Sequence, residues 1–287
     1  MFSNDFIDNA FLAGTFIAIA AGLAGYFVVL RNQVFVADAQ SHVAFTGALA
    51  AVAAGGDAAL GLFGATIAGS LVMGALGGRA RGRDVAIGVT FAWILGLGAL
   101  FLTLYTTSRS ASNGAAGVTI LFGSIFGITT ARAFIAAGVG AAVSLATLAL
   151  ARPLVFSSVD PDVAAARGLP VRTLGLAFMV IVGVTVGEAV QAIGALLIFG
   201  LLVTPPLTAQ LLTARPYAAL ALSAALSVAS MWAGLTLSYV LPRIPPSFLV
   251  VAVAFAAYLV VVVAGAIRGR YAQKVSGNAR SERIAAT

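Results

Sequence analysis

The chain has 287 residues, of which 61% are hydrophobic and only 9% are charged. Soluble domains carry about a quarter charged residues, so this composition excludes a soluble globular enzyme, and the many apolar side chains exclude a disordered chain. The absence of cysteine excludes disulfides and thiolate metal sites. A net charge of +7 would suit a nucleic-acid binder, but the placement of the charges argues otherwise. What is left is an integral membrane protein that crosses the bilayer several times.

The apolar residues fall into about nine runs, each close to the roughly 20 residues that a helix needs to cross the hydrocarbon core. In chain order the runs cover roughly residues 10–30, 35–55, 60–78, 85–106, 131–151, 172–190, 193–213, 217–240 and 246–267. They are apolar on all faces and rich in Gly and Ala, which lets helices approach closely within lipid. We therefore predict an all-α polytopic membrane protein with about nine transmembrane helices, within a range of eight to ten.

The basic residues indicate the orientation of these runs. The first residues of the chain include acids but no Lys or Arg, so we place the N-terminus outside, and nine crossings then place the C-terminus in the cytoplasm. Thirteen of the sixteen basic residues then fall on inner segments, and only Arg109, Arg132 and Arg243 fall on outer ones. This bias follows the positive-inside rule and reflects anionic lipid rather than nucleic acid. Residues 1–267 are expected to form one membrane domain, and 268–287 a polar cytoplasmic tail.

Two connections are too long to be simple turns. The outer one, from about 107 to 130, contains the apolar stretch 121–127, which is too short to span and suits a re-entrant or interfacial helix. In the inner one, from about 152 to 172, Ser158 or Asp160 can cap a helix, Pro161 suits its first turn and Gly168 can end it. This pattern predicts a capped helix of about two turns at about 158–168, on the cytoplasmic face.

Ionisable groups at membrane depth are rare and therefore candidates for function. Asp38 and the only histidine, His42, lie four residues apart, so a helix presents both from one face. Together they form half of a site for a divalent cation, because imidazole suits Zn, Mn or Fe(II) and carboxylate suits the harder of these ions. A hydrogen-bonded structural pair and a proton relay are the alternative interpretations. Ser41, and Glu188 near the outer boundary, are further candidates for contact with the ion.

Two other features bear on mechanism. Thr204, Pro205 and Pro206 lie inside the seventh run, where two missing N–H groups predict a helix break that either lines the pathway or serves only packing. The sequence has no GxxxxGK[ST] phosphate loop, so the chain is not expected to be an ATP-hydrolysing enzyme. No permanently bound cofactor is expected either.

These segments together resemble the permease subunits of the zinc/manganese (metal-chelate) ABC-3 family of ABC transporters, over roughly residues 8–266. Residues 35–42 with Gly47 are similar to the family's Asp-x-x-x-His segment, and 121–125 to its Leu-Phe-Gly-Ser segment. Residues 161–168 are similar to the cytoplasmic loop that meets the ATPase, and 190–209 to the Val-Gly-x-Leu-Leu…Pro-Ala run. The order and spacing of the four segments carry the resemblance.

The resemblance implies a type II importer-like permease in a bacterial inner membrane, with Asp38 and His42 lining the metal path. It implies a second permease copy, an ABC ATPase and an extracytoplasmic metal-binding protein as partners, and zinc, then manganese, as the cargo. The coupling helix would contain Asp160, Pro161, Asp162, Ala164, Arg167 and Gly168. Relatives often have an acid in an Asp-x-Pro-x-Gly-Pro pattern before the last span, where this chain reads Leu241-Pro242-Arg243-Ile244-Pro245.

Two other functions stay open from the sequence. A permease of the same kind could carry a siderophore or cobalamin, although such relatives usually have an additional span and a longer chain. A secondary transporter or channel could use Asp38 and His42 as an ion relay, but it would be expected to contain inverted repeats and more intramembrane charge. No clear internal repeat is visible.

Overall fold

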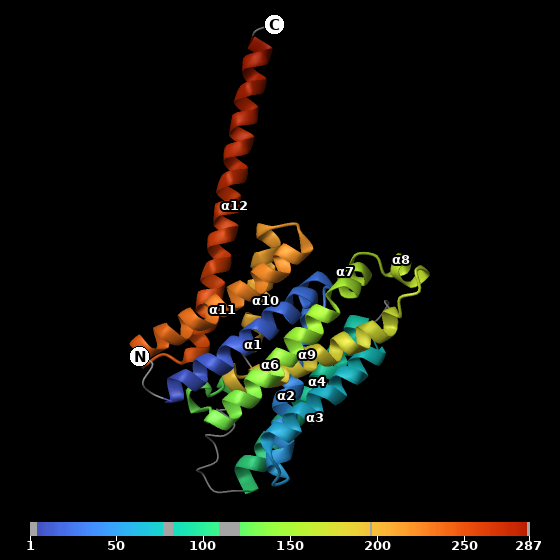
Figure 1. Cartoon of the computed structure of the whole chain (residues 1–287), viewed down its shortest axis with the longest axis vertical. Helices are drawn as coiled ribbons and strands as arrows, with labels where there is room; N and C mark the ends of the chain where they lie inside the picture. Colours follow the sequence, from blue (N-terminus) through green and yellow to red (C-terminus); the bar gives the residue numbers. More distant parts are fainter. Residues whose placement is uncertain (1–4, 77–82, 109–120, 196, 286–287) are drawn as a thin grey trace.

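The computed structural model of the chain describes residues 5–76, 83–108, 121–195 and 197–285, and in these ranges the regular structure is entirely helical (Figure 1). The elements, in chain order, are α1 (Asp5–Leu30), α2 (Val34–Ala53), α3 (Ala58–Leu76), α4 (Arg83–Ser108), the 3₁₀-helix η2 (Ile125–Gly127), α6 (Thr130–Ala149), α7 (Ala151–Val159), α8 (Pro161–Ala166), α9 (Val171–Ile193), α10 (Ile198–Leu212), α11 (Pro216–Val240) and α12 (Pro246–Ala285).

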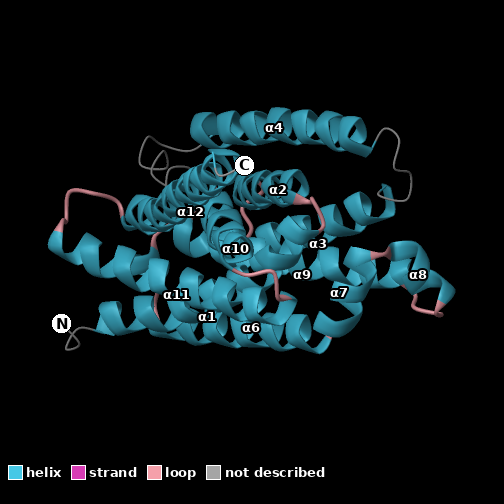
Figure 2. Ribbon diagram, turned by 90° about the horizontal axis from the view of Figure 1, so that it is seen from above, coloured by secondary structure: helices cyan, strands magenta, loops and turns pink. Residues whose placement is uncertain are grey.

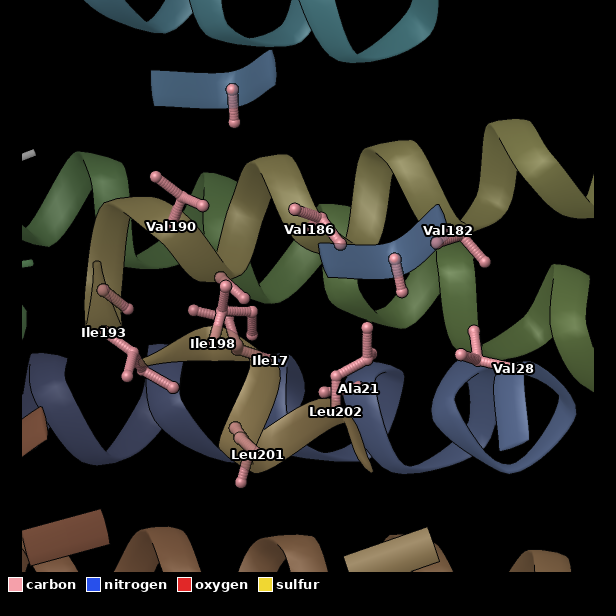
Figure 3. Close-up of a cluster of buried hydrophobic side chains, with 14 of the residues drawn as sticks. Ile17, Ala21, Val28, Val182, Val186, Val190, Ile193, Ile198, Leu201 and Leu202 are labelled. Carbon is pink, nitrogen blue, oxygen red and sulfur yellow. The ribbon is translucent and has the colours of Figure 1, made fainter. Parts of the chain in front are cut away.

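Helix α1 lies at the centre of the fold and packs against α6, α9, α10 and α11. Small residues on α1 make this possible, since Ala10, Ala13, Ala18 and Ala24 are completely buried and let neighbouring backbones come close. Buried side chains from all three helices, most of them larger than alanine, fill the space between α1, α9 and α10. Those labelled in Figure 3 are Ile17, Ala21, Val28, Val182, Val186, Val190, Ile193, Ile198, Leu201 and Leu202. The core therefore joins segments far apart in the sequence.

Helices α2, α3 and α4 form a second group, which is joined to the core mainly where α9 packs on α2 and α3. In the view of Figure 2, α4 lies at the edge of the bundle. Helices α2 and α3 touch backbone to backbone at Gly47 and Gly61, where a Cβ on either glycine would collide with the carbonyl oxygen of the other. This contact fixes the position of α2, the helix that carries Asp38 and His42.

Seven of the described helices are long and apolar enough to cross a membrane: Phe6–Leu30, Ala58–Ala75, Gly88–Thr107, Thr130–Ala149, Val171–Ile193, Pro216–Val240 and Pro246–Ile267. The other two predicted runs correspond to α2 and α10. Helix α2 has 20 residues but is not among the seven, and α10 has only 15, or about 22 Å at 1.5 Å per residue. The all-helical membrane architecture is confirmed, whereas nine crossings and the orientation stay predictions.

The connection between α6 and α9 contains more helix than the sequence predicts. Helix α7 follows α6 after the single residue Leu150, and α8 follows α7 after the single residue Asp160. The Asp160 side chain accepts a hydrogen bond of 3.0 Å from the Val163 N–H, and Pro161 occupies the first turn of α8. Gly168 has a φ of +82° just after the helix. The predicted capped helix is present, with bounds at Pro161 and Ala166.

The last element, α12, is a single helix that extends away from the bundle (Figure 1). Its apolar part, Pro246–Ile267, packs on α10 and α11. The backbone stays helical to Ala285, through most of the residues for which the sequence predicts a polar tail. A Cβ on Gly234 of α11 would meet the backbone of Val250 within 2.5 Å, so close packing of small residues anchors α12 as it does α2.

Candidate metal pathway

The turn between α1 and α2 sets where Asp38 and His42 lie. Only Arg31, Asn32 and Gln33 separate the two helices, and Asn32 adopts a left-handed φ of 53°, a conformation that Asn tolerates better than most residues. The Gln33 N–H returns to the Val28 carbonyl at 2.8 Å. This short, hydrogen-bonded turn places the first two turns of α2 close to the end of α1.

Asp38 and His42 are both half-buried and lie on one face of α2, as their spacing predicts. Asp38 lines a pocket of about 540 Å³ together with Asn32, Phe35 and Phe199. Because Asn32 and Phe35 are exposed, this pocket lies at the surface of the protomer rather than in its core. The carboxylate is therefore accessible to an ion and to a neighbouring chain.

Aromatic rings hold the His42 imidazole in place. The Phe91 ring, on α4, meets it edge to face with the ring centroids 5.1 Å apart, and Phe35 meets Phe91 in the same manner at 5.7 Å. No hydrogen bond or ion pair engages the Asp38 carboxylate or the His42 ring within the described part of the chain. The two groups attract each other electrostatically but form no hydrogen bond, so their donor atoms are available to a ligand.

The opposite face of α2 is fixed by buried hydrogen bonds. Gln40 is completely buried and donates to the Ser70 hydroxyl at 2.7 Å, and Ser70 donates to the Thr66 carbonyl at 2.7 Å. Ser41 is also buried and donates to the Asp38 carbonyl at 2.7 Å. The candidate ligand Ser41, three residues after Asp38, is therefore buried beside the pair, with its hydroxyl proton engaged by the backbone.

The double proline does not break α10. The helix runs from Ile198 to Leu212 through Pro205 and Pro206, and the chain is interrupted earlier, where Gly194 has a φ of +90°. Pro206 removes the N–H that would bond to the Leu202 carbonyl. That carbonyl instead faces Gly25 of α1, at the position a Cβ would occupy. Close packing on α1 thus accommodates the prolines, and Thr204, whose carbonyl accepts from the Thr208 hydroxyl, is part of a continuous helix.

The interruption at Gly194 packs against the segment that precedes η2. Gly123 and Gly194 both have positive φ, and a Cβ on either would collide with the backbone of the other's segment. The Ser247 hydroxyl of α12 donates to the Phe122 carbonyl at 2.6 Å. The apolar stretch predicted to be re-entrant thus packs against the ends of α9 and α12, although residues 109–120 of the same loop lie outside the described part.

Glu188 is placed away from Asp38 and His42. It lies on α9 and lines a cavity of about 390 Å³ with Ser124, Arg132 and Gln191. Only 6% of the residue is exposed, and its Oε2 atom is buried with no hydrogen-bond partner. The structure therefore does not bring the two candidate acids together.

The predicted coupling residues surround α8. Of the helix itself, Ala164 is completely buried, while Pro161, Asp162 and the remaining residues are exposed. The Arg167 guanidinium lies over the Phe156 ring of α7 at 6.0 Å, a distance at which cation–π attraction applies. This arrangement anchors α8 by one small buried side chain and leaves the rest of its surface exposed.

Residues 3–265 match the ABC 3 transport family. The chain belongs to this family. Members with curated descriptions include the "Manganese transport system membrane protein MntC" of Halalkalibacterium halodurans, 29% identical over 84% of this chain and 81% of the relative. The "Manganese import system permease protein ScaB" of Streptococcus parasanguinis is 30% identical over 82% of each chain. A "Probable iron transport system membrane protein" of Haemophilus influenzae is 27% identical over 82% of this chain and 85% of the relative.

Solved structures with the same fold agree with the family assignment. "PsaBC from Streptococcus pneumoniae in complex with Fab" matches with a TM-score of 0.78 and 27% identity, over 90% of this chain and 91% of that one. "An inward-facing conformation of a putative metal-chelate type ABC transporter" matches with a TM-score of 0.67 and 20% identity, over 88% and 84%. The chain therefore has the fold of a multi-pass ABC transporter permease.

Two residues that position the site carry no signal in the sequence. A single glutamine in an apolar run has no periodic pattern, yet Gln40 hydrogen-bonds α2 to α3. Phe91 is one of 18 phenylalanines, and only the structure shows its ring against His42. Both effects depend on contacts between helices that are distant in sequence.

Proposed function

We propose that the chain is the membrane-spanning permease subunit of an ATP-driven importer of a divalent transition metal, with manganese as the first candidate for the cargo. One observation carries the proposal: the Asp38 carboxylate and the His42 imidazole lie on one face of α2, beside a pocket at the protomer surface. Neither group forms a hydrogen bond with another described residue. The family relatives described above are named for manganese and iron. This favours manganese over the zinc that the sequence alone put first.

The site needs a second copy of the chain. The described residues contain no cluster of three or more His, Asp or Glu that could hold an ion, so one protomer supplies only Asp38 and His42. Structural zinc usually has four ligands, and manganese prefers more. A two-fold axis beside the Asp38 pocket would double the pair to four ligands from identical surfaces. We therefore expect a homodimer whose metal path lies between the two copies, in a bacterial inner membrane.

Partners would act at the two ends of this path. An ATPase subunit would bind the exposed surface of α8, and ATP-driven movement of α8 would be transmitted through α7 and α9, on which it packs. An extracytoplasmic metal-binding protein would deliver the ion at the opposite end.

The remaining candidate residues would have structural roles. Ser41 donates its hydroxyl proton to the backbone. Thr204, Pro205 and Pro206 would serve to pack α10 on α1 rather than to break α10.

Uptake by the reconstituted transporter tests the proposal. The permease, its ATPase and its binding protein would be placed in liposomes, and radiolabelled Mn²⁺, Zn²⁺ and Fe²⁺ would be compared with and without ATP. We expect ATP-dependent Mn²⁺ uptake, and a loss of at least about tenfold in His42→Ala and Asp38→Ala, since each removes one of two donors per protomer.

A matched control is Thr103→Ala, which removes an exposed hydroxyl that bonds only within α4 and should leave uptake unchanged. Uptake that is normal in both His42→Ala and Asp38→Ala would refute the proposed site. A wild type that moves none of the three ions despite an active ATPase would favour a metal-chelate or cobalamin cargo, and uptake independent of ATP would favour a secondary transporter or channel.

A further inference from the structure

The second candidate acid, Glu188, presents a physical problem that the proposed pathway does not solve. Its Oε2 atom is buried, and no hydrogen bond or ion pair to the carboxyl group occurs among the described residues. An ionised carboxylate in such surroundings is strongly unfavourable unless a cation or hydrogen-bond donors compensate it. Glu188 must therefore carry a proton or face a bound cation.

The surroundings of Glu188 favour a ligand rather than tight packing. The side chain lines a cavity of about 390 Å³, which is large enough for an ion with several waters. The Gln191 amide and the Ser124 hydroxyl line the same cavity, and neither side chain is engaged in a hydrogen bond among the described residues. The cavity thus offers a carboxylate, an amide and a hydroxyl, a set of oxygen donors that suits hard divalent cations.

This cavity is separate from the Asp38 pocket. The two share no lining residue. Ala48 and Val52 of α2 line the Glu188 cavity, and they follow His42 by six and ten residues, or about 9 and 15 Å along the helix axis. The cavity also lies within one protomer, between α1, α2, α3, α6 and α9, and would not need a second copy.

We propose that Glu188, with Ser124 and Gln191, forms a second cation site, for a hard divalent ion held by oxygen donors. The choice of ligand rests in part on the proposed function, because Mn²⁺ is both such an ion and its first candidate cargo. The same chemistry would also accept Mg²⁺ or Ca²⁺ from the surroundings. In either case the ion would compensate the buried carboxylate and link the end of α9 to the segment before η2.

Arg132 provides a test with a definite sign. Its exposed guanidinium lines the same cavity but forms no ion pair with Glu188. If a metal ion occupies the cavity, the guanidinium repels it, and Arg132→Gln should tighten metal binding several-fold. If Arg132 were instead the counter-ion of Glu188, the same substitution would not strengthen metal binding and would lower the stability of the protein.

The experiment would measure Mn²⁺ binding to the purified permease–ATPase complex in nanodiscs by calorimetry and electron paramagnetic resonance. Asp38→Ala with His42→Ala would remove the other site in all samples. We expect one Mn²⁺ per permease, binding at least tenfold weaker in Glu188→Gln and several-fold weaker in Gln191→Leu, the second variant guarding against misfolding of the first. Competition by Mg²⁺ and Ca²⁺ would tell a general divalent site from one selective for the cargo.

The outcomes separate this site from the proposed function. Absence of Mn²⁺ binding in the double variant, unchanged binding in Glu188→Gln and Gln191→Leu, or weaker binding in Arg132→Gln would overturn the second site. Mn²⁺ uptake that depends on His42 would still support the importer in each of these cases. Conversely, Mn²⁺ binding that depends on Glu188, in a protein that transports no metal, would support the site while refuting the importer.

Discussion

Two glycines of α3, one turn apart, test how α2 is held in place. Gly61 faces α2, where a Cβ would collide with the Gly47 carbonyl oxygen and with the Ala51 Cβ. Gly64 is exposed, and a Cβ there would have no heavy atom within 4 Å. We therefore predict effects of opposite sign for Gly61→Ala and Gly64→Ala, although the chemical change is the same.

The magnitude follows from two terms. Replacing Gly by Ala within a helix gains up to about 1 kcal/mol at both positions. At Gly61 the added methyl group also overpacks two rigid neighbours, which typically costs about 1–3 kcal/mol. Gly64→Ala should thus stabilise the protein by up to about 1 kcal/mol, and Gly61→Ala should destabilise it by up to about 2 kcal/mol. Because the helix term is common to both, the difference between the variants measures the overpacking cost alone.

The assay is denaturation in mixed micelles, followed by helix content, with Mn²⁺ uptake measured on the same preparations. Gly61→Ala should also reduce uptake, because moving α2 on α3 displaces Asp38 and His42. Gly64→Ala should leave uptake unchanged. Equal stability changes in the two variants would show that α2 and α3 are not in backbone contact, and would refute the reasoning that their contact positions the site.

Two further predictions concern the ends of helices. Asp160→Ala removes the cap to the Val163 N–H and should lower the stability of α8 by about 1 kcal/mol. It should also reduce the amount of metal transported per ATP hydrolysed. Asp160→Asn keeps a capping side chain and should change neither quantity, so equal transport per ATP in the two variants would contradict the role of the cap. Gly194→Ala should destabilise the protein by about 1–3 kcal/mol, since alanine disfavours the φ of +90° and its Cβ would meet the Leu121 carbonyl. Its control is Gly175→Ala, inside α9, where an added Cβ would have no heavy atom within 4 Å; this change should be neutral or stabilising. Similar denaturation curves for the two glycine variants would count against strain at Gly194.

The elements that the sequence predicted well are those governed by local patterns. The run at 85–106 corresponds to α4 at Arg83–Ser108, and the run at 172–190 to α9 at Val171–Ile193. The capping pattern at Asp160 and Pro161 placed the start of α8 correctly. Hydropathy and caps act within one segment, so they can be read without knowing the neighbours of that segment.

Features that depend on distant segments were not predictable. The seventh run was expected to break at its prolines, but Gly25 of α1 accommodates the freed Leu202 carbonyl, and the interruption lies at Gly194. The sequence made Glu188 a further candidate for contact with the ion, but it lines a cavity separate from the pocket beside Asp38. Both features depend on how α1, α9 and α10 pack together, which the sequence of any one of these helices does not determine.

The way Asp38 and His42 are held bears on the affinity of the proposed metal site. In sites that retain their metal, a ligating imidazole usually donates its second N–H to a carboxylate or carbonyl, and this support raises affinity by about 10–100-fold. Within the described part of the chain neither side chain has such a hydrogen-bonding partner, and the imidazole is oriented by the Phe91 ring and by electrostatic attraction to Asp38. The site should therefore bind its ion more weakly than a site with the same ligands whose imidazole is supported by a hydrogen bond. An importer needs this property, because an ion that is bound tightly on entry cannot be released on the other side.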